Sequence, residues 1–590
     1  MIEKRYQVIV VGGGISGVCA ALASARHGAK TALIQDRPVL GGNASSEIRM
    51  HICGAGREGQ RPNARETGIV EEILLENQLQ NPQHSFSICD TILWEKTREQ
   101  NNLDVYMNTR FLSTDASSGR INGIRAQQMT TEKVFHFTAD IFIDATGDGM
   151  LAFQAGAQVM HGREGKETFG ESLAPDIPDD YTMGNSLMFT ARDMGHPVPF
   201  QAPKWAYHYT DANIPGHRDH NNGPVVEATS GYWWLELGGD CQDSLEDCEK
   251  IRDELLKTLY GVWDHLKNQD QGCENLALDW VGFLPGKRES RRIVGDYILC
   301  QNDLVEGRLF DDDIAYGGWH LDLHPIGGFA SFGNFEEPNE KVRQLKQLKQ
   351  IYGIPYRCLL PVGMNNLLMA GRAISVSHIA FGSTRVMATC GVIGQAAGTA
   401  AAIAACAETE PRKINVTELQ LALMRDDCYL PGNHLPSEAK KVKAVCSSYE
   451  AGYEPEKIFD GYLRSEENDS HAWKPETTDP TPWLEMQFGK PREVKKVILR
   501  FDSNCSAHYA ISMSKWWQDR IPRGVPKEIV KDYSLTFYQN SCCIKKVAVH
   551  DNYLRLNCVE LEQKIICDAV RLTIYSACET KVFQMETYTD

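Results

Sequence analysis

Apolar and polar residues at the start of the chain follow the spacing of a strand, then a helix, then a second strand. Tyr6 to Val11 is an apolar run, Ile15 to His27 is rich in alanine, and Thr31 to Ile34 is apolar again. This order predicts a β-α-β unit. Residues 101–146 are β-rich and end in the apolar run 139–144, which we expect to rejoin the first sheet.

The pattern changes in the middle of the chain. Residues 160–360 are rich in Trp, His, Pro and Gly, and amphipathic helices are predicted at Ser244 to Lys267 and Glu340 to Gln350. An apolar strand is predicted at Asn366 to Gly371, and the small residues from Ala388 to Ala405 predict a helix that packs close to a sheet. We expect the middle region to face the substrate.

Long helical periodicity is lost beyond Pro431. The polar, turn-rich segment 431–437 marks a predicted domain boundary. The tail then shows short apolar runs separated by turns: Trp483 to Phe488, Val494 to Phe501, Tyr533 to Tyr538 and Ala569 to Tyr575. Such spacing predicts a β-sandwich.

Length and charge narrow the class of protein. A chain of 590 residues is long enough for about two or three hydrophobic cores. The 61 Lys and Arg residues against 78 Asp and Glu residues give a net charge of −17, which disfavours nucleic acid and anionic membrane surfaces as partners. We expect no stretch to approach the roughly 20 apolar residues of a membrane span, and the first residues run directly into a strand. The expected location is the cytoplasm, or the periplasm if a leader has been removed.

The cysteines suggest no zinc or dithiol site. The sequence contains 18 cysteines but no Cys-x-x-Cys pair. Cys542, Cys543, Cys558, Cys567 and Cys578 are dense enough for disulfides only in an exported protein. We expect thiols, most of them buried as small apolar side chains.

A glycine motif between the first predicted strand and helix indicates a dinucleotide site. It reads Gly12-Gly13-Gly14-Ile15-Ser16-Gly17 and fits G-x-G-x-x-G in the strand-to-helix context that gives the motif meaning. The first glycine permits a tight turn, the second lets backbone approach a pyrophosphate, and the third lets the helix pack on the sheet. A purely structural glycine turn is the alternative.

The ribose ligand at the end of the second strand has two candidates. An acidic residue is usual there, but this position holds Gln35, and Asp36 follows one residue later. A glutamine amide can also bond a diol, so both residues remain candidates.

Three further segments resemble the signatures of flavoproteins with two dinucleotide-binding domains. Leu40 to Ser46 resembles their flavin-binding loop, and Asp144 to Gly149 resembles the turn beside the adenosine half. Leu367 to Ala373, with Gly382 to Arg385 and Gly391 to Gly398, resembles the segment that closes around the isoalloxazine ring. The resemblance implies FAD as cofactor, and with the glycine motif it implies contacts from Gly12, Gly13, Gly14, Ile15, Ser16, Gly17, Gln35, Asp36, Gly41, Gly42, Asn43, Ser45, Ala145, Thr146, Gly147, Asp148, Gly371, Arg372, Gly394 and Gln395.

With Pro285 to Arg292, these segments are similar to the FAD-dependent oxidoreductase family of bacterial carbohydrate-utilisation loci. The resemblance implies an α/β protein. Its Rossmann-like FAD-binding domain would comprise residues 1–160 and 355–430, with an inserted α+β substrate region at 161–354. A fragment ending near Leu430 should then keep every cofactor motif and bind FAD.

The tail resembles a discoidin-type, galactose-binding-like module of jelly-roll type over residues 440–590. The resemblance is carried by Ala444 to Ser448, Ile458 to Gly461, Trp473 and Trp483 to Gly489. In such modules the Asp-Gly turn and both tryptophans are largely structural. Carbohydrate binding is therefore one interpretation of the tail, and domain packing or oligomer contact is the other.

Four residues are the candidate catalytic groups: His51, His378, Arg385 and Arg288. A neutral imidazole near pH 7 suits removal of a hydroxyl proton as hydride leaves, so either histidine is a candidate base. A core histidine bonded to backbone is the alternative for both. Arg385 would bind the flavin edge or an anionic substrate, or it would form a structural ion pair. Cys53 is expected to pack against its neighbours without a chemical role.

Other polar and aromatic groups in the middle region have two interpretations each. Arg288, Arg291 and Arg292 would pair with the pyrophosphate or with nearby carboxylates. On a strand, His320, Asp322 and His324 would share one face, which suits a polar pocket better than a metal, and we predict no metal site. The aromatic surface suited to a sugar ring comprises Trp205, Tyr207, His208, Trp233 and Trp234.

The leading hypothesis is oxidation of a secondary hydroxyl of a sugar, glycoside or polyol by hydride transfer to FAD. The first alternative is a C=C reductase of the fumarate-reductase-like type, in which Arg288 or Arg385 would be the proton donor. The second alternative is a carbohydrate-binding flavoprotein without redox chemistry. The sequence does not identify the substrate or the electron acceptor, and a homo-oligomer is compatible with it.

Overall fold

The computed structural model describes residues 1–215, 228–229, 235–334, 340–437, 442–467, 469–575 and 579–589. The chain forms two compact units. One comprises residues 1–57, 83–419 and 510–521, and the other comprises residues 58–82, 420–509 and 522–590. The predicted domains placed residues 58–82 and 420–430 in the FAD-binding domain and 510–521 in the sandwich, whereas the contacts assign each of these three segments to the other unit.

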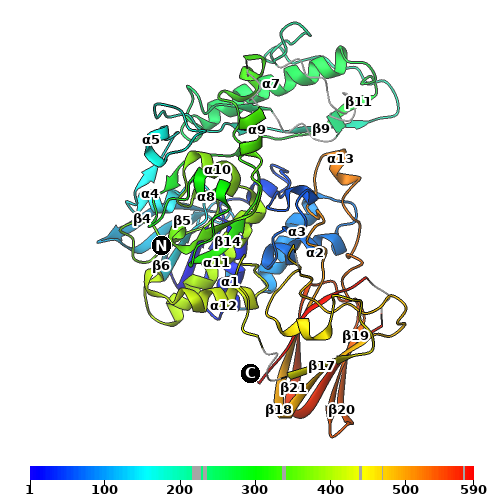
Figure 1. Ribbon diagram of the computed structural model, residues 1–590. Coiled ribbons are helices and arrows are strands. Elements are labelled where there is room, and N and C mark those ends of the chain that lie inside the picture. Colours follow the sequence, from blue (N-terminus) through cyan, green and yellow to red (C-terminus); the bar gives the residue numbers. More distant parts are fainter. Residues whose placement is uncertain are drawn as a thin grey trace. The chain divides into compact units, whose positions relative to one another are not determined.

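The first unit is built on a seven-stranded sheet in the order β3-β2-β1-β6-β5-β4, with β16 also paired to β6 (Figure 1). The strands β3, β2, β1, β6 and β16 are parallel, and β6, β5 and β4 are antiparallel. Their bounds are β1 Ile2–Val11, β2 Thr31–Ile34, β3 Leu103–Tyr106, β4 Thr109–Ser117, β5 Arg120–Gln128, β6 Val134–Asp144 and β16 Leu367–Met369. The predicted Rossmann-like α/β architecture is confirmed.

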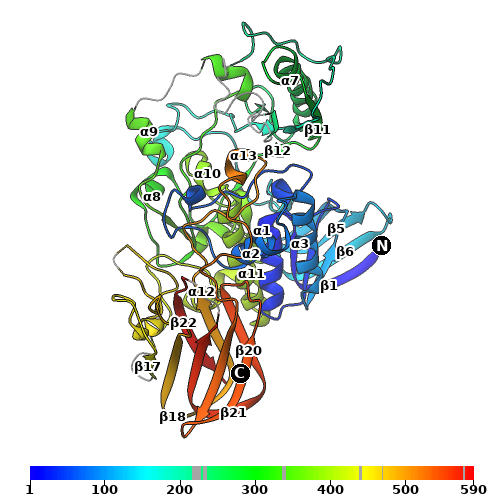
Figure 2. The same cartoon turned by 90° about the vertical axis from the view of Figure 1, so that its right-hand side faces the viewer.

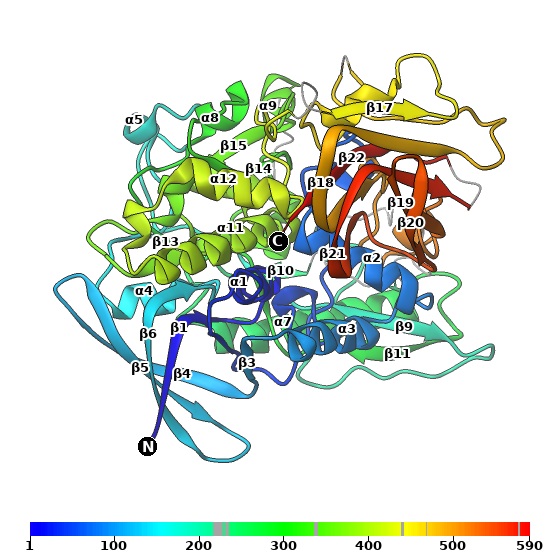
Figure 3. The same ribbon diagram turned by 90° about the horizontal axis from the view of Figure 1, so that it is seen from below.

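Two helices of small residues lie against each other beside this sheet. Helix α1 (Ile15–Arg26) and helix α11 (Met387–Cys406) run side by side in Figures 2 and 3. Gly394 lies against the backbone of Ser16 and Gly398 against that of Ala20, so that a Cβ at either glycine would collide with a carbonyl of α1. Glycine at these positions lets the helices approach this closely.

Helix α11 also corrects one expectation. By length and composition alone it is apolar enough to cross a membrane, with a mean hydropathy of 1.4, whereas we expected no such stretch. Within the fold, 89% of that window is buried, as in the core helix of a globular domain. The predicted helix over Ala388 to Ala405 is correct to within one residue at each end.

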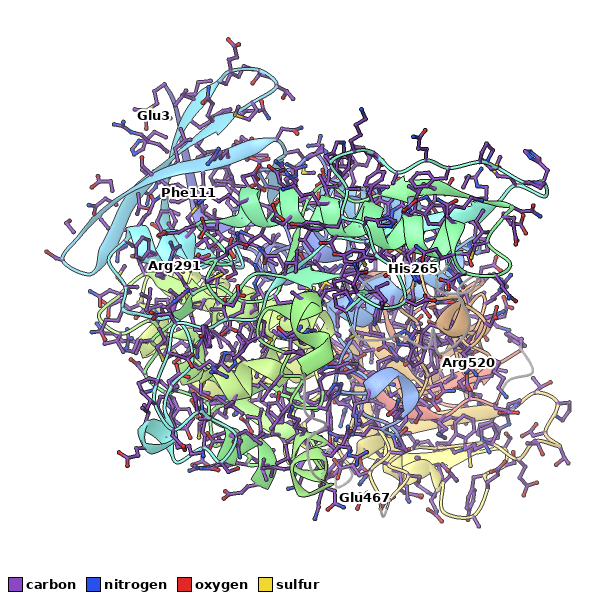
Figure 4. All side chains as sticks on the ribbon, turned by 90° about the horizontal axis from the view of Figure 1, so that it is seen from above. Glu3, Phe111, His265, Arg291, Glu467 and Arg520 are labelled. Atoms are coloured by element: carbon purple, nitrogen blue, oxygen red, sulfur yellow. The ribbon has the colours of Figure 1, made fainter. Side chains whose placement is uncertain are left out.

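The middle region is α+β, as predicted. Helix α7 packs Trp263 and its neighbours against β9 and β11, which pair antiparallel (Figure 4 labels His265 of α7). A small sheet has the order β10-β8-β12, and β14 pairs with β15. The bounds are α7 Cys248–Asn268, β8 Asn185–Ser186, β9 Phe189–Asp193, β10 Glu236–Leu237, β11 Leu276–Val281, β12 Gly286–Lys287, β14 Asp313–Gly317 and β15 Tyr352–Pro355.

The first unit contains further elements, most of them short. They include α3 Phe86–Glu99, α4 Met150–Gln154, α5 Lys166–Phe169, α8 Gln301–Glu306, α9 Glu340–Lys346, α10 His378–Thr384, α13 Lys515–Gln518, β7 Val159–Met160 and β13 Arg292–Ile293. Residues 319–324 have no regular secondary structure, so the strand considered for His320, Asp322 and His324 does not form. Trp233 and Trp234 lie outside the described residues.

The second unit contains the predicted all-β sandwich. Its strands have the order β17-β18-β21-β19-β20, and β22 pairs with β18, all antiparallel (yellow to red in Figure 1). Alternate residues of the central strands point inward around the fully buried Trp473. The two runs predicted from Trp483 to Phe501 form one long strand. The bounds are β17 Val442–Cys446, β18 Trp483–Phe501, β19 Tyr533–Gln539, β20 Cys542–Val549, β21 Leu556–Ile574 and β22 Val582–Tyr588.

Residues 58–82 join this second unit through buried ion pairs. Arg65 bonds Glu71 at 2.8 Å, and the Ser503 hydroxyl donates to the same carboxylate at 2.5 Å. Arg555 lies 3.8 Å from Glu71 and 3.0 Å from Asp427. Helix α2 (Ile69–Gln80), which carries Glu71, is followed along the chain by the first unit, and helix α12 (Val416–Arg425) precedes Asp427. No disulfide joins the described cysteines of either unit, and Cys578 is outside the described residues.

Candidate active site

The glycine motif and the other flavoprotein signatures begin at the carboxyl ends of adjacent parallel strands. Val11, the last residue of β1, pairs with Ile34 and with Asp144, and Asp144 pairs in turn with Met369. Because parallel strands end at one edge of a sheet, the segments that follow these residues meet there. Ligands of open α/β sheets bind at this edge.

The turn after β1 leaves open space where a pyrophosphate would bind. Gly12 has a φ of 104°, and a Cβ there would collide with the Ala145 carbonyl. By contrast, a Cβ on Gly14 would point into open space. Apart from its chain neighbours, no described residue would lie within 4 Å of that Cβ. Helix α1 begins directly after Gly14 with no side-chain cap, and the buried Ser16 hydroxyl has no hydrogen-bond partner among the described residues. Unpaired N–H groups at a helix start favour an anion, so these residues fit a dinucleotide phosphate.

Gln35 holds the glycine turn rather than lying open at the strand end. Its Oε1 accepts a hydrogen bond from the Gly13 N–H at 2.9 Å, and its Nε2 donates to the Val39 carbonyl at 3.0 Å. Asp36 is exposed. Both remain predicted ribose ligands, and the structure adds a positioning role for Gln35.

The loop after β2 packs directly on the glycine turn. The Gly41 N–H donates to the Gly13 carbonyl at 2.8 Å, and Gly41 forms a parallel bridge with Gly14. Gly42 has a φ of 58°, and a Cβ there would lie 3.1 Å from the Gly14 Cα. The Asn43 side chain donates to the Lys287 carbonyl at 3.1 Å, while Ser45 is buried. The two predicted cofactor loops therefore form one surface.

The turn after β6 is fixed by a buried carboxylate. Asp144 accepts hydrogen bonds from the Thr146 N–H at 2.9 Å, the Thr146 hydroxyl at 2.7 Å and the Ala152 N–H at 2.8 Å. Burial raises the pKa of Asp144, although these hydrogen bonds oppose the shift. The residue shapes the turn that presents Ala145, Thr146 and Gly147.

Asp148, a predicted cofactor contact, is held by two cations. Its carboxylate pairs with Lys287 and, at 2.9 Å, with Arg372, and it accepts the Ser290 hydroxyl at 2.9 Å. Burial opposes ionisation, but the charges of Arg372 and Lys287 lower the pKa of Asp148 from 3.8 to about 2. These contacts tie the turn after β6 to the segment after β16.

The last predicted cofactor segment lies across α1. Gly371 has a φ of 81°, and a Cβ there would lie 3.3 Å from the Ser16 Cβ. Gly394 and Gln395 are in the buried part of α11 that packs on α1. The structure thus brings the glycine motif and the later signatures together around Ser16.

His378 forms a buried pair with Glu289. Its Nδ1 lies 2.9 Å from the Glu289 carboxylate, and the side chains are 8% and 0% exposed. Burial opposes ionisation of Glu289, but His378 and Arg292 outweigh it and lower the pKa of that carboxyl group. A charged carboxylate only accepts hydrogen bonds, so the ring donates its Nδ1–H to Glu289 and its Nε2 is not part of this contact.

Arg288 and Arg385 belong to a cluster of alternating charges next to this pair. Arg288 lies 3.3 Å from Glu236, and Arg385 lies 2.7 Å from Asp322. His324 joins the two carboxylates, at 2.6 Å from Glu236 and 3.2 Å from Asp322. Burial works against the charge of His324, but the carboxylates outweigh it and raise its pKa.

Two neighbouring backbone groups connect the cluster to the His378 pair. The Met183 N–H donates to Glu289 and the next N–H, of Gly184, donates to Glu236, each at 2.9 Å. Arg288 donates to the Ser186 hydroxyl at 2.8 Å. Both acidic groups are therefore fixed by the backbone just before β8.

Other candidates lie elsewhere. Arg292 pairs with Glu164 at 2.8 Å, whereas the guanidinium of Arg291, which Figure 4 labels, lies 4.1 Å above the Phe153 ring. The arginine run thus meets carboxylates at Arg288 and Arg292 rather than forming one basic cluster. His51 is half-buried, and two residues later the Cys53 carbonyl accepts from the Ala388 N–H at 2.8 Å.

No group of three or more His, Cys, Asp or Glu side chains among the described residues is arranged to hold a metal ion. His320 lies 3.6 Å from Asp322, within the charge cluster. Trp205 is 52% exposed and packs edge-on against Tyr260. Tyr207 bonds Glu254. Trp205 therefore offers an exposed aromatic surface. The contacts given above for Trp205 and Tyr207 do not involve His378.

These strand ends and glycine turns define a dinucleotide-binding protein of the Rossmann-like class. The chain belongs to the FAD dependent oxidoreductase family, which matches residues 7–423, and its cofactor is FAD. Residues 443–518 match the F5/8 type C domain, in agreement with the all-β tail. The predicted family, cofactor and enzyme class are confirmed.

Two curated proteins resemble a short segment of the chain. The chain is 44% identical over 45 residues to the soluble pyridine nucleotide transhydrogenases of Marinobacter nauticus and Hahella chejuensis, which is 8% of this chain and 10% of those proteins. The chain thus spans about a tenth of the length of these curated relatives.

The solved structures that it resembles include a family 32 carbohydrate-binding module of C. perfringens NanJ in complex with galactose. That match has 14% identity and a TM-score of 0.19, and it covers 26% of this chain and 96% of the module. A Streptococcus pneumoniae fucose binding module, SpX-3, matches at 14% identity and a TM-score of 0.21, over 27% of this chain and 98% of the module.

Two acidic partners of the site, Glu289 and Glu236, were not predicted from the sequence, whereas Asp322 was predicted to line a polar pocket. Glu289 lies inside the quoted arginine-rich run, and an acidic residue in such a run was a usable signal. Glu236 lies outside this run, and its partners Arg288 and His324 are distant in sequence, so it carries no comparable signal.

Proposed function

We propose that the protein oxidises a secondary hydroxyl of a sugar, glycoside or polyol. The buried His378–Glu289 pair supports this proposal most directly, because a hydroxyl that loses hydride must also lose its proton to a base. The F5/8 type C match is consistent with a carbohydrate context.

His378 would accept the hydroxyl proton at Nε2. Glu289 keeps the ring oriented and stabilises the imidazolium that forms, since the two side chains are in hydrogen-bond contact and shielded from water. When bound, FAD supplies the hydride acceptor. The open space at Gly14 and the start of α1 would hold its pyrophosphate, and Ser16 would donate to it.

The charge cluster would orient the substrate. Arg288, Arg385 and His324 offer donors, and Glu236 and Asp322 offer acceptors, a combination suited to a ligand with several hydroxyl groups. Each of these groups already has a charged partner, which keeps it in a fixed position before a ligand binds.

A C=C reductase remains the second candidate because of Arg288. Burial lowers the pKa of its guanidinium, and the nearby positive charge of Arg385 lowers it further, whereas Glu236 opposes the shift. A guanidinium with a lowered pKa is a better proton donor to a carbon centre. This reaction would use the same FAD site in the opposite direction.

Anaerobic single-turnover reduction of the bound flavin by a panel of sugars and polyols tests the proposal. We expect at least one of them to bleach the flavin absorbance, and His378→Ala to slow that step by about 100- to 10,000-fold at equal FAD occupancy. His51→Ala shows whether the second candidate base takes part. His550→Ala is the matched control, because its side chain is 69% exposed and lies outside every proposed site.

The other outcomes separate the alternatives. If no sugar reduces the flavin but an enoate reoxidises the reduced protein, the C=C reductase is correct. If neither reaction occurs and sugars bind with unchanged flavin absorbance, the carbohydrate-binding hypothesis is correct. An unchanged rate in His378→Ala would remove that residue from the mechanism.

A further inference from the structure

A segment of the C-terminal region belongs to the FAD-binding unit. Residues 510–521 lie in sequence between β18 and β19 of the sandwich, and most of them fall within the F5/8 type C match. Their contacts nevertheless place them in the unit formed by residues 1–57 and 83–419 (Figure 4 labels Arg520 of this segment).

Two apolar side chains anchor the segment. Ile511 and Met513 are 6% and 8% exposed, and they form a hydrophobic cluster with Ile48, Phe86 and Met188. The half-buried Met50 and Trp280 pack against the same cluster. The alternate residues Ser512 and Ser514 are also buried, so the segment is enclosed on both sides.

Ile48 connects this cluster to the predicted flavin loop. Its N–H donates to the Ser45 carbonyl at 3.1 Å, and two residues later the Met50 N–H donates to the Asn43 carbonyl at 2.8 Å. Residues 41–50 therefore form one compact loop, and Gly41 at its start bonds the glycine turn that faces the pyrophosphate site.

Ile48 also touches the strand that leads to the catalytic groups. A Cβ on Gly286 would lie 3.0 Å from the Ile48 Cγ2, and Asn43 bonds the carbonyl of Lys287. Arg288 and Glu289 follow immediately along the chain. A shift of Ile48 would thus move both the flavin loop and the residues that hold His378.

We infer that Ile511 and Met513 are positioning residues for FAD, which the C-terminal region contributes to the active unit. They act by holding Ile48 and so fix residues 41–50 and strand β12 in the arrangement that binds the cofactor. This inference rests on the FAD site and is independent of the substrate. It assigns the C-terminal region a role in the flavin chemistry beyond any ligand that its sandwich binds.

The test is the double variant Ile511→Ser/Met513→Ser, measured by FAD titration and by the visible flavin spectrum. Coupling through packed side chains of this kind predicts about 2- to 30-fold weaker FAD binding and altered flavin absorption bands. Ile511→Val/Met513→Leu should restore both. The matched control is Ile566→Ser on β21 of the sandwich, whose side chain is 51% exposed and which should bind FAD as wild type does.

A milder variant keeps the test decisive if the double variant does not fold. Met513→Ala removes part of one side chain and should give a smaller change of the same kind. Wild-type affinity and spectrum in a folded Met513→Ala or double variant would overturn the inference alone. A wild-type protein that binds no FAD would overturn the proposed function as well.

Discussion

Gly14 allows cofactor binding to be separated from folding. It lies at φ −66° and ψ 176°, which any residue adopts, and a Cβ there points into open space. Gly14→Val should therefore change the free energy of unfolding of the apoprotein by less than about 1 kcal/mol. The added isopropyl group would occupy the space where the pyrophosphate meets the start of α1.

The loss of affinity follows from the hydrogen bonds that are displaced. A hydrogen bond to a charged group contributes about 1.5 to 3 kcal/mol, and losing two of them weakens FAD binding by about 100- to 10,000-fold. FAD at 100 times its Kd should stabilise the wild-type protein by about 2.7 kcal/mol and should stabilise the variant hardly at all. Fluorescence titration and thermal unfolding with and without FAD measure both effects.

Two further variants make the comparison specific. At Gly489 on β18 a Cβ would also point into open space, so Gly489→Val should leave both stability and FAD affinity unchanged. At Gly17 a Cβ would collide with the Gly12 carbonyl, so Gly17→Val should prevent folding. Wild-type FAD affinity in Gly14→Val would refute the reasoning and place the cofactor elsewhere.

Three other predictions follow from the buried contacts. Gly398→Val should destabilise the protein by more than about 3 kcal/mol, because its Cβ would collide with the Ala20 backbone, and a wild-type urea midpoint would contradict this. Burial raises the pKa of Asp313 from 3.8 to about 7 in the folded protein. Between these two pH values the folded state holds a proton that the unfolded state has lost, so the free energy of unfolding decreases as the pH rises from 3.8 to about 7. Asp313→Asn should therefore flatten the dependence of the Tm on pH between 5 and 8, and equal slopes in both proteins would show that Asp313 is not responsible. A fragment ending near Leu430 keeps the glycine motifs and should bind FAD more weakly than the full chain. Its residues 58–82 should be cut readily by protease, because the fragment lacks the strands that bury them. Resistance of these residues to protease would contradict the buried contacts of that segment.

The cofactor-binding half of the protein was predictable because its signals are local. The apolar run before Gly12 sets the strand end, and a side chain at Gly12 or Gly17 would collide with neighbouring backbone. The same holds for Gly41 and Gly371. Parallel pairing of strands then brings these separate motifs to one edge without any further information.

The chemical groups around His378 were less predictable. Glu289 lies 89 positions away in sequence, and the pairing depends on how the middle region packs. Neither residue shows a periodic or spacing signal that names the other. Likewise, the sequence around Ile511 does not show that this side chain packs on Ile48. An apolar residue in a loop between two strands of the sandwich looks the same in the sequence whichever hydrophobic core it joins.

The second unit combines residues 58–82 with segments from the end of the chain, and this affects how the protein folds during synthesis in the cell. Glu71 receives its hydrogen bond from Ser503, which is 432 positions later, and Arg65 is buried beside the same late segment. At typical elongation rates the ribosome needs about 20 to 90 s to make that interval. During this time the apolar face of α2 and its charged groups lack the surface that will bury them. The nascent chain must therefore carry an unfinished segment ahead of a largely complete FAD-binding domain, and we expect it to require chaperones until the C-terminal strands emerge.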